Sequence, residues 1–359
     1  MGFFLSDFEK LMQSAFKLAE KGLGYTSPNP PVGAIIYKNG KVIARGYHKR
    51  AGLPHAEIEA LRRAGKNARG SILVTTLEPC SHHGKTPPCV DAIIAARVKT
   101  VVGAINDKNR VVDGKGYGRL REAGIEVISG VLIHKAAVFY RPYFKYITRG
   151  IPYVTLKFAQ SIDGRIAAKT GDSRWISSPQ SLKLSHQLRA VSDAILIGNR
   201  TVKIDNPQLT TRLVRGPNPV RIILSASGKI NLKRFVFTDK SAPTYIATSA
   251  TAGIKNYENV VTVRKKGEML DLPDLLAKLG RMGIVSLLVE GGSAVLTSFL
   301  KYKLVDRLIV CIAPMMIGEG IDSIGELGVA KIGKSVRFRE IEWRKSGPDM
   351  IFIGQPIWR

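Results

Sequence analysis

The spacing of apolar residues near the start of the chain changes from a helical to a strand period. Behind Ser6, which opens a capping-box pattern, apolar residues recur three or four positions apart and predict a helix to about residue 21. Val32–Tyr37 and Lys41–Tyr47 then have the composition of strands, and Asn39-Gly40 between them is typical of a tight hairpin turn. The chain therefore enters a sheet by way of a helix and a hairpin.

Helices and strands alternate after the hairpin, which indicates a sheet with helical crossovers. An amphipathic helix near Ile133–Lys145 and the segment Gly150-Ile-Pro152 have the character of a connector. We therefore place a domain boundary near residue 148. The predicted helices before it are His55–Ala64, Pro88–Ala96 and Gly116–Ala123, and the predicted strands are Ser71–Thr76, Thr100–Ile105 and Ile125–Ile128.

The second half repeats this alternation without repeating the sequence. We expect strands near residues 153–158, 193–198, 220–224, 244–248, 260–263 and 284–289, and helices near 179–190, 272–282 and 293–302. The length of 359 residues suits two domains of about 150 residues each. The predicted organisation is two α/β domains, residues 1–148 and 149–359, and two unlike domains suit two unlike activities.

Composition places the chain among folded proteins of a reducing compartment. Hydrophobic residues make up 45% and charged residues 23%, which excludes disordered and collagen-like classes. No apolar run reaches the roughly 18 residues of a membrane span, and no secretion signal opens the sequence. The three cysteines, Cys80, Cys89 and Cys311, are an odd number, which argues against a disulfide framework. We therefore expect a cytoplasmic protein that avoids membranes, with Cys311 buried.

The net charge of +27 is spread over both halves of the chain. Such a surface attracts nucleic acid, but it equally steers phosphorylated metabolites. It is also compatible with a solvated basic surface that has no specific partner. Charge by itself does not choose among these three interpretations.

A candidate metal site comes from the starts of two predicted helices. His55 and Glu57 open one of them, Cys80 precedes the other, and Cys89 lies at its start. One imidazole and two thiolates form a three-ligand zinc site with a fourth position for water, as in catalytic zinc sites, whereas a structural site needs a fourth ligand. Zinc lowers the pKa of bound water to about 7, and Glu57 is placed to carry its proton to a departing amine. The pattern predicts a hydrolytic site with Glu57 as its catalytic residue.

A second candidate site follows the predicted strand 284–289. Glu290-Gly-Gly-Ser293 leads from this strand into a helix, and the free N–H groups of such a turn can bind a phosphate. A tight strand-to-helix turn without a ligand explains the two glycines equally well. No Gly-x-Gly-x-x-Gly follows a strand, which disfavours a Rossmann domain.

The spacing around the two cysteines resembles that of one enzyme family. His-x-Glu followed by Pro-Cys and a second Cys is the signature of zinc deaminases. Pro-Cys-Ser-His-His-Gly-Lys-Thr-Pro-Pro-Cys89, with Asn29-Pro-Pro-Val-Gly33 upstream, resembles the deaminase half of the bifunctional riboflavin-biosynthesis deaminase/reductase. The resemblance spans most of residues 5–130 and implies a cytidine-deaminase-like three-layer αβα fold. It also implies pyrimidine contacts from Asn29, His82 and Lys85, whereas Asp107-Lys-Asn-Arg110 departs from the family's Asp-Pro-Asn-Pro.

The second half resembles the reductase half of the same family over about residues 152–315. The segments that carry this resemblance begin at Lys157, Thr170, Leu188 and Thr201, and they occur in the family's order. The resemblance implies a dihydrofolate-reductase-like α/β fold and NADPH as cofactor, while Arg200 departs from the family's small residues. By this resemblance the cofactor-binding residues are Ala159, Trp175, Thr201, Asp205, Gly292, Ser293, Ala294, Val295, Leu296, Thr297 and Ser298, and the substrate-binding residues are Ser173, Arg189, Leu209, Arg212 and Glu290.

The resemblance implies two consecutive reactions. The zinc domain would deaminate 2,5-diamino-6-ribosylamino-4(3H)-pyrimidinone 5′-phosphate, and the second domain would reduce the ribosyl group to give 5-amino-6-(5-phosphoribitylamino)uracil. We expect this phosphorylated pyrimidine as the small-molecule partner, a homo-oligomer, and no specific nucleic acid. A nucleic-acid-editing deaminase is the main alternative, but it leaves residues 152–315 unexplained. A metal-binding scaffold without activity is the other, and the intact ligand set with Glu57 speaks against it.

Overall fold

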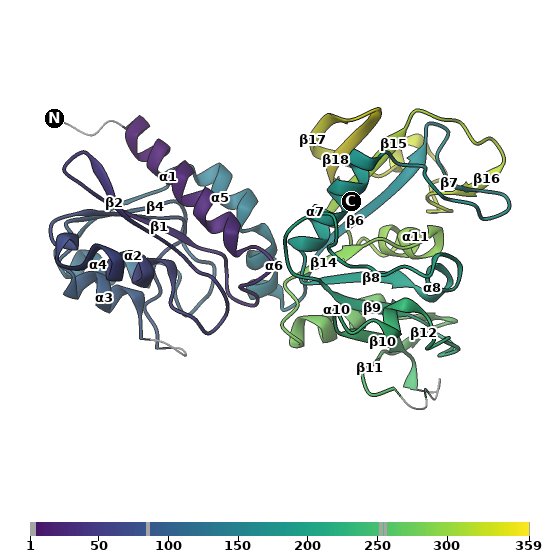
Figure 1. Cartoon of the computed structure of the whole chain (residues 1–359), viewed down its shortest axis with the longest axis horizontal. Coiled ribbons are helices and arrows are strands. Elements are labelled where there is room, and N and C mark those ends of the chain that lie inside the picture. Colours follow the sequence, from purple (N-terminus) through teal and green to yellow (C-terminus); the bar gives the residue numbers. More distant parts are fainter. Residues whose placement is uncertain (1–4, 84–86, 251–253, 255–256, 359) are drawn as a thin grey trace. The chain divides into compact units, whose positions relative to one another are not determined.

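Residues 5–83, 87–250, 254 and 257–358 are described by the computed structural model. Contacts between residues divide the chain into two units, Met1–Gly150 and Ile151–Arg359, where the sequence indicates a boundary near residue 148. A five-stranded sheet forms the centre of the first unit and a nine-stranded sheet that of the second (Figure 1). Among the described residues, no helix is long and apolar enough to cross a membrane.

The sheet of the first unit begins with the predicted hairpin. Strands β1 and β2 pair antiparallel around Asn39-Gly40, and the positive φ angles of both residues are those of a tight hairpin turn. The next three strands run parallel to one another, as expected for strands joined by helical crossovers. The strand order is β2-β1-β3-β4-β5, with β1 Gly33–Lys38, β2 Lys41–Tyr47, β3 Ile72–Thr75, β4 Thr100–Gly103 and β5 Glu126–Ser129.

Helices cover both faces of this sheet, so the predicted three-layer αβα architecture is confirmed. Helices α1 and α5 lie on one face, while α2, α3 and α4 lie on the other (Figure 1). Phe16 of α1 and Phe139 of α5 are in edge-on contact, with ring centroids 5.4 Å apart. The helices are α1 Leu5–Ala19, α2 Ala56–Ala64, α3 Cys89–Ala95, α4 Lys115–Glu122, α5 Ile133–Phe139 and α6 Arg141–Arg149.

Two local predictions in this unit are wrong. The single helix expected at Ile133–Lys145 is two helices that meet at Tyr140, because Pro142 has no N–H for the helical bond to the Val138 carbonyl. The buried Tyr140 hydroxyl donates to the Pro31 carbonyl at 3.0 Å. Helix α1 begins at Leu5, so Ser6 lies inside its first turn instead of capping it.

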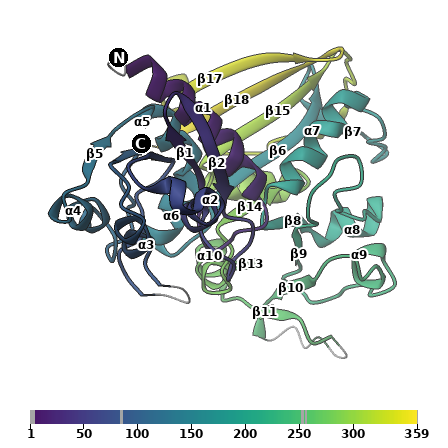
Figure 2. The same ribbon diagram turned by 60° about the vertical axis from the view of Figure 1, so that its left-hand side comes forward.

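The nine-stranded sheet of the second unit is parallel except at one edge. Seven strands, from β11 to β15 in the sheet order, run in one direction, and β18 and β17 complete the edge antiparallel. Figure 2 shows β6, β15, β18 and β17 lying side by side. The sheet order is β11-β10-β9-β8-β14-β6-β15-β18-β17, with β6 Tyr153–Ser161, β8 Ala194–Gly198, β9 Val220–Leu224, β10 Thr244–Thr248, β11 Val260–Thr262, β14 Ser286–Val289, β15 Arg307–Ala313, β17 Arg337–Ser346 and β18 Asp349–Ile357.

Alternate residues of the central strands pack into separate cores on the two faces of the sheet. Ala194 and Leu196 of β8 contact the core that contains helices α10 and α11. Ile195 and Ile197 contact the core that contains α8 and α9. Both faces of β8 are therefore buried, as expected for a parallel sheet between helices. The helices are α7 Pro179–Ala190, α8 Asn199–Asp205, α9 Phe235–Thr238, α10 Leu272–Arg281 and α11 Ser293–Lys301.

Sequence periodicity did not predict the strands at the C-terminal edge. Strand β17 carries alternating charges and is exposed along almost its whole length, so it has no buried face to give an apolar pattern. Strand β15 holds Cys311, which is buried as predicted. Four short strands also lie outside the sequence prediction, in the pairs β7 Arg165–Ala168 with β16 Gly320–Asp322 and β12 Lys265–Lys266 with β13 Met269–Leu270.

Candidate functional sites

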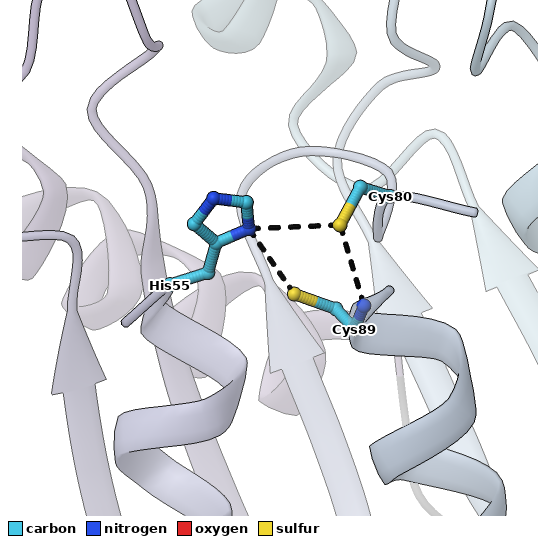
Figure 3. A group of neighbouring side chains, drawn as sticks. All are labelled: His55, Cys80 and Cys89. Carbon is cyan, nitrogen blue, oxygen red and sulfur yellow. Dashed lines mark hydrogen bonds between the residues drawn. The ribbon is translucent and has the colours of Figure 1, made fainter. Parts of the chain in front are cut away.

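Three potential metal ligands converge in the first unit. His55 Nδ1 lies 3.2 Å from Cys89 Sγ and 3.6 Å from Cys80 Sγ (Figure 3). The ligand atoms of all three residues lie within 4.8 Å of one another. One imidazole and two thiolates at this separation suit tetrahedral zinc, and they leave one position open.

Two helix N-termini hold these ligands in place. His55 precedes the first residue of α2, and Cys89 is the first residue of α3. Cys80 lies in the loop after β3, where the backbone N–H of Cys89 donates to its sulfur at 3.3 Å. Hydrogen bonds from the Cys89 thiol and from His55 lower the pKa of Cys80 to about 4 despite its burial. The site thus favours a thiolate, which is the form that binds a metal.

Glu57 lies in the first turn of α2, beside the metal ligands. Its side chain is 3% exposed, and this burial raises the pKa of Glu57 to about 7, against the opposing charge of His55. A carboxyl group with a pKa near 7 can both take up and release a proton at neutral pH. Glu57 therefore has the position and the protonation behaviour of a general acid and base.

Glu57, His55 and Cys80 line a cavity of about 280 Å³. In the same cavity, Asn29 Nδ2 lies 3.3 Å from His48 Nε2, and the His48 ring contacts that of His55. His48 Nδ1 lies 3.2 Å from the Pro54 carbonyl, to which it donates, so Nε2 is the acceptor for Asn29. Burial lowers the pKa of His48, which favours this neutral form. His82 also lines the cavity, and its buried Nδ1 has no partner among the described residues.

A second cavity, of about 500 Å³, lies in the second unit at the carboxyl ends of β6, β8 and β14. Ala159 belongs to β6, Gly198 ends β8, and Glu290 directly follows β14. Ligands of open parallel sheets bind at this edge, because the loops that leave the strands diverge there. The residues from Gly291 to Val295, which connect β14 to α11, form part of the cavity wall.

A buried ion pair lies at the base of this cavity. Arg189 donates from Nε and Nη2 to Glu290 Oε2, at 3.0 and 2.6 Å. Burial alone raises the pKa of Glu290, but the charges of Arg189 and Lys157 outweigh it and hold that pKa below its usual value. Glu290 Oε1 is buried and has no hydrogen-bond partner among the described residues. An acceptor of this kind is suited to a ligand hydroxyl.

Glycines bring the backbone of the β14 to α11 connection close to its neighbours. A Cβ atom at Gly291 would lie 2.6 Å from Val295 Cβ, and one at Gly198 would lie 3.0 Å from Val295 Cγ2. Only glycine therefore fits at Gly291 without displacing the first turn of α11. Gly291 thus has a packing reason as well as a position beside the cavity, whereas a Cβ at Gly292 would meet only Thr201 Oγ1, at 3.4 Å.

Two family models match the chain, one in each unit. The cytidine and deoxycytidylate deaminase zinc-binding region matches residues 5–105, and the RibD C-terminal domain matches residues 152–352. The riboflavin biosynthesis protein RibD of Aquifex aeolicus is 44% identical over 95% of this chain and 96% of its own length. The RibD of Escherichia coli is 40% identical over 95% and 97%. The chain belongs to the RibD family.

Solved structures agree with this membership of the RibD family over both units. A diaminohydroxyphosphoribosylaminopyrimidine deaminase/5-amino-6-(5-phosphoribosylamino)uracil reductase of Thermotoga maritima has a TM-score of 0.88 and 37% identity, covering 98% of this chain and 99% of the other. A RibD of Acinetobacter baumannii has a TM-score of 0.89 and 33% identity, covering 99% and 100%. The chain is accordingly a bifunctional deaminase and NADPH-dependent reductase of riboflavin biosynthesis, with a zinc-binding deaminase domain.

The structure places most of the expected RibD site residues at the two cavities. Asn29 and His82 line the first, and Lys85 lies outside the described residues. Trp175 is 77% exposed and lines a smaller pocket that it shares with Ala159, Ser173 and Asp205. The expected residues that line the second cavity are Ala159, Ser173, Arg189, Thr201, Asp205, Glu290, Gly292, Ser293, Ala294 and Val295, and Arg200 joins them.

Besides Trp175, five expected residues of the reductase site are not part of the wall of the second cavity. Leu209 and Leu296 are buried in the hydrophobic core. The hydroxyls of Thr297 and Ser298 donate to carbonyls one turn earlier in α11, at 2.7 Å each. Arg212 is exposed, and its backbone N–H donates to His186 Nδ1. Because the side chains of Leu296, Thr297 and Ser298 are buried or hydrogen-bonded within α11, these residues offer a ligand mainly their backbone groups.

His48 and Lys157 are among the polar cavity residues that sequence reasoning missed. His48 follows the hairpin strand β2, and the register of Gly33 opposite Tyr47 brings it to the loop of Asn29. Lys157 is buried in the otherwise apolar strand β6 and lines the second cavity. For His48 the available sequence signal was the hairpin register, and for Lys157 it was a lysine inside an otherwise apolar strand.

Proposed function

We propose that this chain removes the 2-amino group of 2,5-diamino-6-ribosylamino-4(3H)-pyrimidinone 5′-phosphate and then reduces the ribosyl group, which yields 5-amino-6-(5-phosphoribitylamino)uracil. The observation that carries the proposal is the His55, Cys80 and Cys89 group beside buried Glu57 in one cavity. The match of residues 152–352 to the RibD C-terminal domain supports the second step. The Thermotoga maritima relative, whose two activities carry the names of these reactions, supports the choice of substrate.

In the deaminase domain, His55, Cys80 and Cys89 would hold zinc, which suits their donor atoms and spacing. When bound, zinc lowers the pKa of its water ligand to about 7. Glu57 takes a proton from water and delivers it to the departing nitrogen. Water and the amidine carbon thus give a carbonyl and ammonia.

The pyrimidine would be held by polar side chains that line the cavity together with Glu57. Asn29 and His82 line the cavity, and His82 Nδ1, which has no partner among the residues that the structure describes, is available to a ring substituent. Lys85 completes the proposed set from sequence alone. A cavity of about 280 Å³ suits one nucleotide-sized substrate better than an extended nucleic acid.

In the reductase domain, NADPH would supply a hydride to C1′ of the ribosyl group, and a proton taken up by the ring oxygen completes the opening to ribityl. Ala159, Trp175, Thr201, Asp205 and the residues 292–298 would hold the cofactor. Arg189 and Arg212 would neutralise the substrate phosphate. Ser173 and Glu290 would contact the substrate, with Glu290 Oε1 as acceptor for a hydroxyl, whereas Leu209, expected there too, has its side chain buried in the core.

We further propose that the protein acts in the cytoplasm as a homo-oligomer without a specific nucleic-acid partner. Free cysteines support a reducing compartment. The exposed edge strand β17, ten residues long, supports pairing between copies of the chain. Phosphorylated metabolites account for a basic surface without any nucleic acid.

A paired assay tests the proposal. Purified protein is analysed for zinc, ammonia release and NADPH oxidation with the diaminopyrimidinone phosphate, as wild type and as Glu57→Gln. We expect about one zinc per chain in both proteins. Only wild type should release ammonia, and the variant should oxidise NADPH only when it is given the deaminated compound. Wild type that binds zinc and NADPH but leaves this substrate unchanged would refute the assignment, and structured RNA would be the next substrate to test.

A further inference from the structure

A buried glutamate connects the metal-ligand segment of the deaminase domain to a loop across the cavity. Glu78 lies two residues before Cys80, is 3% exposed and lines the cavity. Its backbone N–H donates to the carbonyl of Ile105, next to the end of β4. The carboxylate therefore points toward the loop that leaves β4, which is the loop whose sequence departs from the family pattern.

Four backbone N–H groups of this loop donate to the Glu78 carboxylate. Oε2 accepts from Asp107 at 3.1 Å and from Gly114 at 3.0 Å. Oε1 accepts from Gly116 at 2.9 Å and from Tyr117 at 3.3 Å. Both ends of the loop are thus fixed by one side chain that belongs to another segment.

The last two of these donors belong to the first turn of α4. Gly114 occupies the N-cap position of this helix and has no side chain with which to cap it. Glu78 satisfies the N–H groups that a capping side chain normally satisfies, and its negative charge lies at the positive end of the helix dipole. At Gly116 a Cβ atom would lie 2.1 Å from the Pro79 carbonyl, so the close approach of the two segments requires glycine.

The loop held in this way forms part of the substrate cavity. Asp107, Asn109 and Val112 line it between the two attachment points. Asp107 is held in turn, because its Oδ1 accepts from the Asn109 N–H at 2.8 Å and its Oδ2 accepts from the Tyr143 hydroxyl at 3.2 Å. A change at Glu78 therefore reaches the wall of the cavity without touching the metal ligands or Glu57.

We propose that Glu78 is a positioning residue for substrate binding in the deaminase domain, and that it acts by fixing the backbone of residues 107–117. This inference rests on the proposed function, since it concerns the site that would bind the diaminopyrimidinone phosphate. Glu78 forms the cavity wall through the loop and takes no part in proton transfer or in metal binding.

Glu78→Gln tests the inference, because an amide keeps the shape of the side chain but replaces one acceptor oxygen by an NH₂ group. Two of the four N–H groups then lose their acceptor, and we expect the KM for deamination to rise about tenfold with kcat changed less than about threefold. Hydrogen exchange of the peptide 107–117 should become faster, while zinc content and the reduction of the deaminated compound stay at wild-type values. Glu122→Gln removes the same charge from an exposed position of α4 and should leave all four measurements unchanged.

A second variant keeps the test decisive if Glu78→Gln does not fold. Gly114→Ala adds a Cβ that meets only Asn106 Nδ2, at 3.9 Å, but strains a residue at φ +79. We expect about a threefold rise in KM and the same acceleration of exchange.

Each contrary outcome has a defined meaning. An unchanged KM with faster exchange overturns the positioning role, a loss of zinc shows that Glu78 acts through Cys80, and a fall in kcat alone shows that it acts on the chemistry. If wild type releases no ammonia from the substrate, the proposed function fails and this inference fails with it. If wild type does so and the KM of Glu78→Gln is unchanged, only this inference fails.

Discussion

The two cavities of this chain are built in different ways. In the deaminase domain, the chemistry lies in side chains, since His55, Cys80 and Cys89 place three ligand atoms within 4.8 Å and Glu57 lies beside them. In the reductase domain, the cavity is formed by the ends of three strands and by the backbone of a glycine turn, with a buried ion pair at its base. A reduction by NADPH takes its chemistry from the cofactor, so the protein has mainly to supply shape and charge.

Because the two sites are built differently, substitutions in the two domains should differ in the size of their effect on activity. Where a few side chains bind a metal and move a proton, one substitution abolishes the reaction. Where many groups together position a cofactor, single substitutions lower affinity or stability by graded amounts. Substitutions in both domains, ordered here by decreasing expected effect, test this contrast.

Removal of one metal ligand should separate the two activities completely. Cys89→Ser replaces a thiolate by a hydroxyl that ligates zinc poorly, so we expect zinc to be lost and deamination to fall by more than about 100-fold. NADPH oxidation with the deaminated compound should stay within about twofold of wild type, because the second domain has its own core. Zinc analysis and the two separate assays measure this. Cys311→Ala, which removes the buried thiol of the other domain, should keep its zinc, and equal zinc loss in both variants would contradict the assigned site.

Glu290→Gln should destabilise the reductase domain, because it leaves Arg189 buried without its charged partner. The side chains of the pair are only 12% and 9% exposed, and breaking such a pair costs about 3 to 5 kcal/mol. The chain has three tryptophans, at Trp175, Trp343 and Trp358, so urea unfolding followed by tryptophan fluorescence reports on this domain alone. Reduction should fall by about tenfold or more in kcat/KM, whereas deamination should be unaffected.

The same variant carries a pH dependence with a defined sign. The pKa of Glu290 is lower in the folded protein than its usual value. Its contribution to the free energy of unfolding is therefore fully present above the unfolded pKa of about 4.3 and is lost as the pH falls through the folded pKa. The difference in unfolding free energy between wild type and Glu290→Gln should be constant from about pH 8 to pH 6 and should shrink below about pH 4. A difference that grows on acidification would show that the ion pair is not the cause.

The ease with which sequence predicts each site follows from the same contrast. Three of the four key residues of the deaminase site, His55, Glu57 and Cys89, lie at the starts of two helices, so their spacing in the sequence was enough to predict a site there. The helical crossovers were also visible, since buried strands and amphipathic helices carry strong periodicity. Strand β17 could not be predicted from periodicity, because it is exposed and has no apolar face. His48 and Lys157 reach their cavities through strand pairing, for which the sequence gives only indirect signals, the hairpin turn and a lysine within an apolar strand.

The family resemblance indicated which segments of the chain form the reductase site. It did not predict which side chains of those segments face the cavity. Leu296 was expected at the cofactor, yet its side chain packs in the core. The Arg189 and Glu290 ion pair joins the end of α7 to the end of β14, residues that are far apart in the chain. Such pairs depend on the order of strands in the sheet, which periodicity does not specify.

Gly291→Ala should have a smaller effect than loss of the ion pair, confined to the glycine turn. The added Cβ would lie 2.6 Å from Val295 Cβ, so the first turn of α11 must shift. We expect the free energy of unfolding to fall by about 1 to 3 kcal/mol and the KM for NADPH to rise about tenfold. Steady-state kinetics with the deaminated compound measure the KM. Gly333→Ala is the matched control, because a Cβ there meets no atom within 4 Å and should change neither quantity.

Trp175→Ala should have the smallest effect on stability and still weaken cofactor binding. The side chain is 77% exposed, so its removal should change the free energy of unfolding by less than about 0.5 kcal/mol. Its pocket is shared with Ala159 and Asp205, and loss of an aromatic contact there should raise the KM for NADPH about threefold to tenfold. Trp343→Ala, an exposed tryptophan of β17, should leave this KM unchanged. If both variants have the same KM for NADPH, Trp175 does not contact the cofactor, and the reductase site is confined to the cavity between Lys157 and Val295. If the two KM values differ as expected, the site extends over exposed side chains that contribute little to stability.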